Sequence, residues 1–148
     1  YVGCTERFKM TEIQLEFEFD QIGKYTREGR YTRPNWDDYF MLIAESVASR
    51  ASCPRASVGV VIVSTDNRIL STGYNGSPPG ELDCLEAGCI IEDEHCQRAI
   101  HAEVNAIGHA ARHGVELRGG RLYMWGHGGV CRECMKVVNA VGLSVHTW

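Results

Sequence analysis

The chain has 148 residues, 44% of them hydrophobic, and a formal net charge of −4 at pH 7; this is enough for one domain with a buried core and too few for two. Domains that hold a nucleic-acid backbone are usually basic, so this charge and the lack of any Lys- or Arg-rich run disfavour a nucleic-acid polymer as a partner. No apolar run approaches the ~20 residues that a membrane span needs, and no signal-peptide pattern is present.

Residues 1–33 are expected to form an N-terminal extension and linker, followed by a single domain over residues 34–148. In the extension, the segment TEIQLEFEFD at 11–20 alternates apolar and polar residues, which predicts a half-buried strand. Residues 25–33 are polar and contain glycine, which favours a linker. The pattern changes at Pro34, where the domain is expected to begin.

The first part of the domain predicts one helix and one hairpin. Asn35 is the expected N-cap of a helix that runs to about residue 50, with acidic residues complementing the helix dipole in its first turn. The β-branched run SVGVVIVS at 57–64 and the segment RILSTGYN at 68–75 flank the turn residues TDN, which indicates a β-hairpin.

The second part alternates helices and strands. It follows a segment at 76–97 that is rich in Gly, Pro and Cys and long for a loop, which often indicates function or an internal brace. The alternation indicates an α/β sandwich. The expected elements are a helix at 100–113 ended by Gly114, a strand at 121–125, a helix at 131–141 ended by Gly142, and a strand at 143–148.

Seven cysteines are many for a chain of this length. A secreted disulfide framework is one interpretation, but a chain with a core of this size does not need such cross-links. Cysteines interleaved with His95 and His101 favour metal ligands in a reducing compartment. We therefore expect a cytoplasmic protein that binds metal.

Cys131 and Cys134 stand three residues apart, which places both thiols on one face of the first turn of a helix. A helix N-terminus lowers the pKa of a thiol and so favours the metal-binding thiolate. Alone, this spacing also serves redox sites and structural zinc. With His101 as a third donor, the set is typical of a catalytic zinc site with one open position.

Glu103 lies two residues after His101 at the start of the same predicted helix. Residues two apart point in opposite directions within a helix, but at its first turn both side chains can reach a metal just beyond the helix end. Glu103 is then placed to take the proton from zinc-bound water. Taken alone, it could equally be an acid that complements the helix dipole.

The pattern H-x-E followed by C-x-x-C is the zinc-deaminase signature. Through SVGVVIV, STGYNGSPPG, CLEAGC, HCQRAIHAEVNAI and CRECMKVV, the sequence resembles the cytidine deaminase superfamily from about Trp36 to its end. GYNGSP together with IHAEVNAI is specific to the deoxycytidylate (dCMP) deaminases. The resemblance implies a three-layer α/β/α sandwich around a mixed sheet. It also implies Zn²⁺-dependent hydrolysis of dCMP to dUMP and ammonia, which supplies thymidylate synthesis.

The resemblance also implies roles for single residues. His101, Cys131 and Cys134 match the family's catalytic zinc ligands, and Glu103 matches the residue that protonates N3 of cytosine and the departing amino group. Asn75 matches a residue that contacts the sugar of the nucleotide, although an Asn-Gly pair is also a common turn. The substrate-binding residues implied by the resemblance are Asn75 and Ala102.

The remaining cysteines are candidates for a second, structural zinc, because some dCMP deaminases carry one. Four donors would close a tetrahedral site and brace the segment at 76–97. The alternative is that they are buried small apolar residues, as free cysteines often are. Cys4, in the extension, is expected to be free. The candidates, of which four would suffice, are Cys53, Cys84, Cys89, His95 and Cys96.

The sequence departs from the family pattern in the link WGHGGVC at 125–131, where Val130 replaces the usual proline and two residues are added. This loop borders the base pocket in the family, so base specificity can differ. Core packing is the favoured role of Trp125, and a solvent-facing position that of His127. The family also continues beyond a fourth strand, so either the C-terminus is short or another subunit covers this edge.

Regulation and assembly are further expectations from the resemblance. Relatives with GYNGSP are activated by dCTP and inhibited by dTTP, and many are hexamers, so we expect a homo-oligomer with an effector site near residues 73–84. The effector-binding candidates are Gly76, Ser77 and Arg112.

Two other functions stay open at this point. One is the same chemistry on a modified dCMP, another cytosine nucleotide, a nucleoside, or adenosine in tRNA. The other is a catalytically silent zinc-binding protein, for example in competence, and the presence of Glu103 argues against it.

Overall fold

The computed structural model describes residues 33–93 and 95–147. The strand predicted at 11–20 lies outside the described residues, as does nearly all of the linker predicted at 25–33. The domain boundary at residue 34 therefore stays a prediction. Among the helices of the described part, none has the length and apolar character needed to cross a membrane.

Four strands form one mixed sheet. The hairpin of β1 (Gly59–Val63) and β2 (Ile69–Tyr74) is antiparallel and confirms the predicted turn at TDN. β5 (Arg121–Trp125) pairs antiparallel with β1 on its other side, and β6 (Ser144–Thr147) pairs parallel with β5. The strand order is β2-β1-β5-β6, which makes β1 a central strand with all five residues buried.

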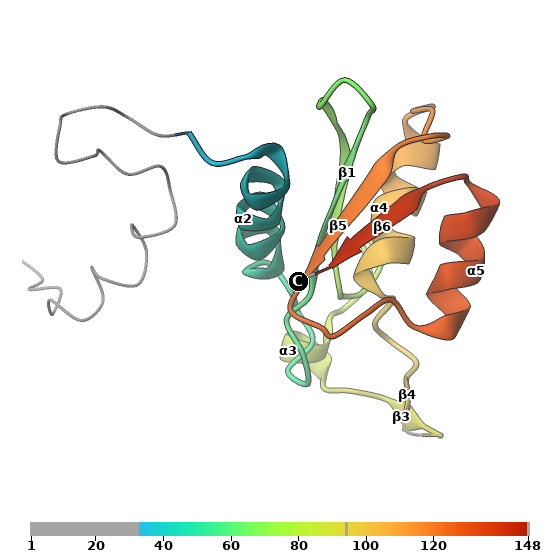
Figure 1. Ribbon diagram of the computed structural model, residues 1–148. Coiled ribbons are helices and arrows are strands. Elements are labelled where there is room, and N and C mark those ends of the chain that lie inside the picture. The colour runs from blue at the N-terminus through green and yellow to red at the C-terminus, as the bar shows by residue number, and fades with distance from the viewer. Residues whose placement is uncertain (1–32, 94, 148) are drawn as a thin grey trace, which may run out of the picture. The chain divides into compact units, whose positions relative to one another are not determined.

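Helices cover both faces of this sheet (Figure 1). α2 (Trp36–Ala48) packs on one face, where Val61, Val63 and Tyr123 meet Phe40 and Ala44. α4 (Ala102–Arg112) and α5 (Arg132–Ala140) pack on the other face, which is lined by alternate residues of β1 and β5. Because a strand in the middle of two packed layers buries both of its faces, the near-continuous apolar run in β1 follows from its position. The predicted three-layer α/β/α sandwich is confirmed.

Two glycines allow the helices to approach the sheet closely. A Cβ atom added to Gly59 would lie 2.9 Å from the Cα of Ala48 in α2. A Cβ added to Gly73 would lie 2.5 Å from the carbonyl oxygen of Ala102 and 2.8 Å from the Cα of Ala106 in α4. Gly73 therefore determines how closely the first turn of α4 sits against β2.

The segment at 76–97, expected as a loop, contains three short elements: α3 (Cys84–Ala87), β3 (Ile91–Glu92) and β4 (His95–Cys96). Asp83 caps α3 through its side chain, and Glu86 completes a capping box. β3 and β4 pair antiparallel. Elements of two to four residues are too short to produce a hydrophobic period, which is why the sequence pattern does not reveal them.

Candidate metal centre and its cavity

His101 is the N-cap of α4, and its backbone is extended, with φ −72° and ψ 151°. Ile100, the residue before it, forms a two-way backbone pair with Gly76: each amide donates to the other's carbonyl oxygen, at 3.2 and 3.0 Å. The predicted helix therefore begins two residues later than residue 100. Since the chain is still extended at His101, the imidazole leaves the backbone before the helix starts and extends beyond the helix end.

Cys131 occupies the same position at α5, because it is the N-cap of that helix and its Sγ accepts a hydrogen bond from the backbone N–H of Cys134. Cys134 lies in the first turn and is buried, with 4% of its surface exposed. Both thiols thus sit at the N-terminus of α5, as the spacing predicts.

These two helix ends bring three donor atoms together. His101 Nδ1 lies 3.5 Å from Cys131 Sγ and 3.3 Å from Cys134 Sγ, and one ligand atom from each of the three residues lies within 4.8 Å of the others. Bond lengths of a tetrahedral zinc site place a ligand nitrogen and sulfur about 3.6 Å apart. The donor types and their separations therefore fit a zinc ion.

Glu103 is buried at the second position of α4, with 4% of its surface exposed. Burial, and then the nearby charge of Glu103, raise the pKa of Cys134 well above its usual range. This differs from the expected lowering by the helix N-terminus, because burial and the charge of Glu103 outweigh the helix dipole. A bound metal would displace the thiol proton.

A cavity of about 470 Å³ opens beside these residues, a size suited to a small organic ligand. His101, Glu103 and Cys131 line it together with apolar side chains from the loop before β1, from β5 and from the segment before α4. Glu103 is the only carboxylate among the described lining residues. The cavity is also lined by Cys53, Arg55, Ala56, Val58, Asn75, His95, Cys96, Ala99, Ile100, Ala102, Met124, His127 and Gly129.

Asn75, predicted to contact the substrate, lines the cavity but also holds a neighbouring loop. Its Oδ1 accepts from Val58 N–H at 2.8 Å, and its Nδ2 donates to the Ala56 carbonyl at 2.8 Å. Its backbone amide donates to Val58, and its backbone carbonyl accepts from Ser52. Asn75 thus fixes both ends of the loop that leads into β1, and its contact with a substrate stays a prediction. Ala102 lines the same cavity.

The two residues of the loop at 125–131 that the sequence analysis singled out, Trp125 and His127, lie in different surroundings. Trp125 packs against the apolar cluster beneath α2, as its favoured core role predicts. His127 is exposed, as expected, but it also lines the cavity, and its Nδ1 lies 2.9 Å from the Gly129 carbonyl oxygen. Gly126 has φ +93°, and any Cβ there would clash with the Ser57 carbonyl. This loop therefore forms part of the cavity wall.

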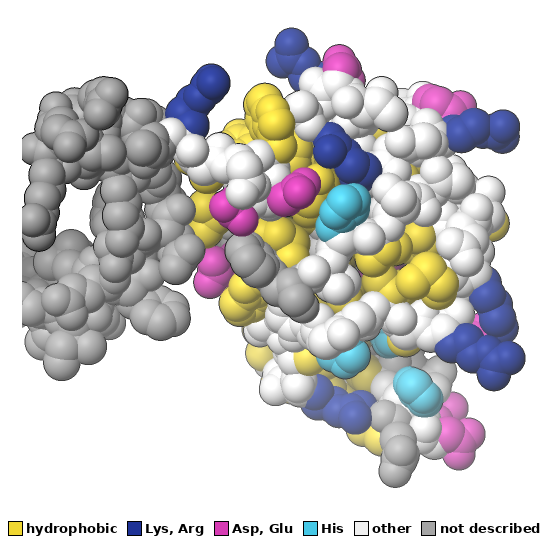
Figure 2. Space-filling view, in the orientation of Figure 1, with side chains coloured by type: hydrophobic (Ala, Val, Ile, Leu, Met, Phe, Trp, Pro, Cys, Tyr) yellow, Lys and Arg dark blue, Asp and Glu magenta, His cyan; other side chains and the backbone are white. Residues whose placement is uncertain are grey.

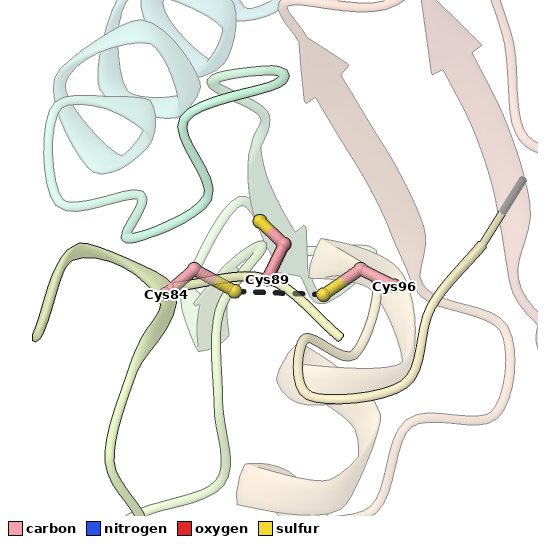
Figure 3. Close-up of side chains that lie close together, drawn as sticks. All are labelled: Cys84, Cys89 and Cys96. Atoms are coloured by element: carbon pink, nitrogen blue, oxygen red, sulfur yellow. Dashed lines mark hydrogen bonds between the residues drawn. The ribbon is translucent and has the colours of Figure 1, made fainter. Parts of the chain in front are cut away.

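Three of the five candidate ligands of a second metal meet in the segment at 76–97. Cys84, Cys89 and Cys96 have sulfur atoms within 4.8 Å of one another. Figure 3 shows the thiols of Cys84 and Cys96 facing each other at 3.5 Å, with Cys89 beside them. Cys53 and His95 are outside this group and line the cavity instead.

The acidities of the clustered thiols differ. Burial and the neighbouring Cys96 and Cys89 thiols raise the pKa of Cys84 to about 12. For Cys96, burial acts in the same direction, but hydrogen bonds from the backbone N–H groups of Ala99 and Arg98 outweigh it and lower the pKa to about 7. Cys96 also lines the main cavity, so the cysteine cluster and the cavity share this side chain.

The effector candidates do not form one group, because Gly76 and Ser77 are adjacent near the start of α4 and Arg112 ends that helix. The amide of Gly76 already donates to Ile100, which opposes its expected use as a phosphate donor. Ser77 has a buried Oγ with no hydrogen-bond partner in the described part of the chain. Arg112 is exposed in the last turn of α4.

Sequence reasoning missed Arg55 as a cavity residue. It belongs to no motif, and the one available signal is an arginine four residues before a buried strand.

Comparison with known proteins agrees with this geometry. The model of the cytidine and deoxycytidylate deaminase zinc-binding region matches residues 34–146. The ComE operon protein 2 of Bacillus subtilis (strain 168) is 40% identical over 111 residues, which are 75% of this chain and 57% of that protein. The deoxycytidylate deaminase of Mycobacterium phage D29 is 36% identical over 124 residues, covering 76% of this chain and 92% of that protein.

A solved structure has the same fold. The dCMP deaminase from the cyanophage S-TIM5 in complex with dCMP and dUMP superimposes with a TM-score of 0.62 at 24% identity, over 79% of this chain and 99% of that chain. The present chain thus covers most of the phage proteins and little more than half of the Bacillus relative.

Proposed function

This chain belongs to the cytidine and deoxycytidylate deaminase family, and from that premise we propose that it hydrolyses dCMP to dUMP and ammonia with the help of zinc. The observation that carries the proposal is the meeting of His101, Cys131 and Cys134 beside a cavity that a buried Glu103 also lines. The relative from phage D29, which is named a deoxycytidylate deaminase, supports the choice of substrate.

The imidazole and the two thiols would hold the metal and leave one of its four positions for water or substrate. Zinc bound there would lower the pKa of water enough to make it nucleophilic near neutral pH. His101 and Cys131 contribute as the caps of two helices that pack on the sheet, so the donors are held in place by the core rather than by a loop.

Glu103 carries the proton transfers. In the net reaction, an oxygen from water bonds to C4 of cytosine and the C4–N bond breaks, so protons must move from the water to N3 and to the departing amino group. A single carboxylate can take the first proton and deliver it to these nitrogens. Glu103 is suited to this role because it is buried and is the only carboxylate among the described residues of the cavity.

The cysteine cluster is the basis for a second part of the proposal. Cys84, Cys89 and Cys96 would supply three of the four donors of a structural zinc that braces the segment at 76–97. The count expected for the loaded protein is about two zinc ions per chain.

Regulation and assembly belong to the same proposal. The partnerless, buried Oγ of Ser77 supports a ligand site near residues 73–84, for which dCTP and dTTP are the candidates. We also propose a homo-oligomer, because the pairing edges of β2 and β6 end the described sheet.

A modified dCMP is the second candidate substrate, and the loop at 125–131 favours it, since His127 and Gly129 form part of the cavity wall. RNA is disfavoured by the charge distribution. On the face shown in Figure 2, Lys and Arg side chains are scattered rather than gathered in one patch.

The test is to measure ammonia release by the zinc-loaded protein from dCMP, 5-methyl-dCMP, deoxycytidine and an adenosine-containing RNA. We expect the highest kcat/KM for dCMP. A preference for 5-methyl-dCMP would favour the second candidate, and no release from any substrate would contradict a deaminase function.

A further inference from the structure

Two histidines stand four residues apart at the end of α4 opposite His101. His109 lies in the last turn of the helix, and His113 is its C-cap. Because residues four apart share one face of a helix, the two imidazole rings meet edge to face with their centroids 4.7 Å apart. Both side chains are exposed, and both lie outside the cavity and the two metal-binding clusters described above.

The ring nitrogens of this pair are unengaged. In the part of the chain that the structure describes, neither ring takes part in a hydrogen bond or an ion pair, and each contacts only the other ring in this way. By contrast, His127 has its Nδ1 beside a backbone carbonyl, and His146 stacks on Tyr123. The pair is therefore free to offer two nitrogens to one ligand.

The distance between the rings suits a shared metal ion. A zinc–nitrogen bond of about 2.0–2.1 Å places the centre of an imidazole about 3.2 Å from the metal, so two imidazoles at a tetrahedral angle have centres about 5 Å apart. The observed 4.7 Å is close to this value. Two histidines at this spacing on a helix also supply the metal ligands of the H-E-x-x-H motif.

The position on the helix also favours a cation. The last carbonyl groups of a helix carry a partial negative charge, which attracts a positive ion near its C-terminus. The exposed Arg112 acts against this attraction with its own charge. Binding at this end therefore has to come from the imidazole nitrogens rather than from a surplus of negative side chains.

We propose that His109 and His113 form a further metal site, which binds one divalent transition-metal ion and leaves its remaining positions to water. Imidazole suits Ni²⁺, Cu²⁺ and Zn²⁺, whereas Mg²⁺ and Ca²⁺ prefer oxygen ligands. An ion held there ties the C-cap to the last turn and so stabilises the end of the helix that carries His101 at its start. This site does not depend on the deaminase function.

The experiment titrates Ni²⁺ into zinc-loaded protein by calorimetry, with the zinc content measured afterwards to show that the bound zinc has stayed. Two donors held on one rigid face act together, so wild type should bind Ni²⁺ about 100-fold more tightly than His109→Gln or His113→Gln, each of which keeps one donor. In NMR spectra, paramagnetic Ni²⁺ should broaden the amide signals of the last turn of α4 first. Mg²⁺ should not bind there.

The matched control combines His109→Gln with Ala111→His. It keeps the number of histidines but places the two imidazoles two residues apart, on different sides of the helix, so it should bind Ni²⁺ as weakly as His109→Gln alone. Arg112→Gln removes a neighbouring positive charge and should bind at least as tightly as wild type. Equal Ni²⁺ affinity of wild type and His109→Gln, in folded and zinc-loaded proteins, would overturn the proposal, as would broadening centred elsewhere.

Discussion

The two clusters of metal-binding side chains differ in what holds them together. His101 and Cys131 cap α4 and α5, whose inner residues Ala106 and Val138 are fully buried against the sheet. Cys84 and Cys96 instead lie on a helix of four residues and a strand of two.

The surroundings of the second cluster are also more open. Leu85 and Ile91, its neighbours in α3 and β3, are 67% and 50% exposed. Elements this short and exposed have little free energy of their own from burial. We therefore expect the fold to place the donors of the first cluster before any metal binds, and the order of the second cluster to depend on the proposed second zinc. The following predictions test this difference.

The largest effect is expected from Glu103→Gln, which keeps the shape of the side chain but cannot transfer a proton. We expect kcat for dCMP to fall by about 10³-fold, with zinc content and melting temperature close to wild type. Glu133→Gln is the control, because Glu133 is exposed in the first turn of α5 and pairs with Lys136 at 2.7 Å; its activity should stay within about twofold. Loss of zinc from Glu103→Gln would instead make Glu103 a ligand.

Gly73→Ala tests whether the fold positions the first cluster. The added methyl would collide with the backbone of α4 at Ala102 and Ala106, and overpacking of this kind costs about 1–3 kcal/mol. We expect a lower free energy of unfolding in urea and reduced activity, because the first turn of α4 carries His101 and Glu103. Gly108→Ala adds a methyl in open space on the same helix and should stabilise by about 0.5–1 kcal/mol. Equal stability of the two variants would contradict the close packing of α4.

Cys89→Ser tests the second cluster. The zinc count should fall from about two to about one per chain, while activity per remaining zinc is largely kept. With free zinc at 100 times the dissociation constant, loss of that ion would lower the free energy of unfolding by about 2.7 kcal/mol, and the difference should vanish in chelator. Cys53→Ser should keep both ions, because Cys53 lies outside the cluster. One zinc per wild-type chain, with an unchanged melting temperature in Cys89→Ser, would make these cysteines packing residues.

The smallest effect is expected on the face of the sheet away from both clusters. Tyr123 donates a hydrogen bond from its hydroxyl to Asp37 at 2.6 Å, so Tyr123→Phe should cost about 1 kcal/mol at pH 7 and leave zinc content and kcat unchanged. A change in zinc content would show that the two faces are coupled.

The pH dependence of this effect follows from the acidity of the phenol. Burial and the bond to Asp37 raise the pKa of Tyr123 to about 12. Because the folded pKa lies above the unfolded value near 10, the contribution is fully present below pH 10 and is lost as the pH rises from 10 through 12. The difference in unfolding free energy between wild type and Tyr123→Phe should therefore shrink over that range. If the difference in unfolding free energy stays constant over that range, the pKa of Tyr123 is not raised in the folded protein.

Much of the fold and the core of the site could be predicted from local patterns. The hairpin at TDN, the helix that starts after Asn35, and the strand at 121–125 follow from hydrophobic period and turn chemistry, which act between near neighbours in the chain. The donors His101, Cys131 and Cys134 stand in the short motifs H-x-E and C-x-x-C, and each motif lies at the start of a helix.

Other features depend on segments that meet only when the chain folds. The choice among the five candidate ligands of the second metal needed the positions of α3 and β4, since the sequence does not say that Cys53 and His95 turn toward the cavity and Cys84, Cys89 and Cys96 toward one another. The raised pKa of Cys134 depends on burial and on the charge of Glu103, which belongs to another helix.

The sequence by itself determined the order of the longer helices and strands, and it predicted the metal donors and Glu103 as their proton carrier, because these predictions rest on short motifs and local propensities. Only the tertiary structure decided that Arg55 lines the cavity and that Asn75 holds the loop on which Arg55 lies. Arg55 and Glu103 are 48 positions apart in the chain and line one cavity. Such a meeting is set by the packing of layers on both faces of a sheet, and no pattern within either segment encodes it.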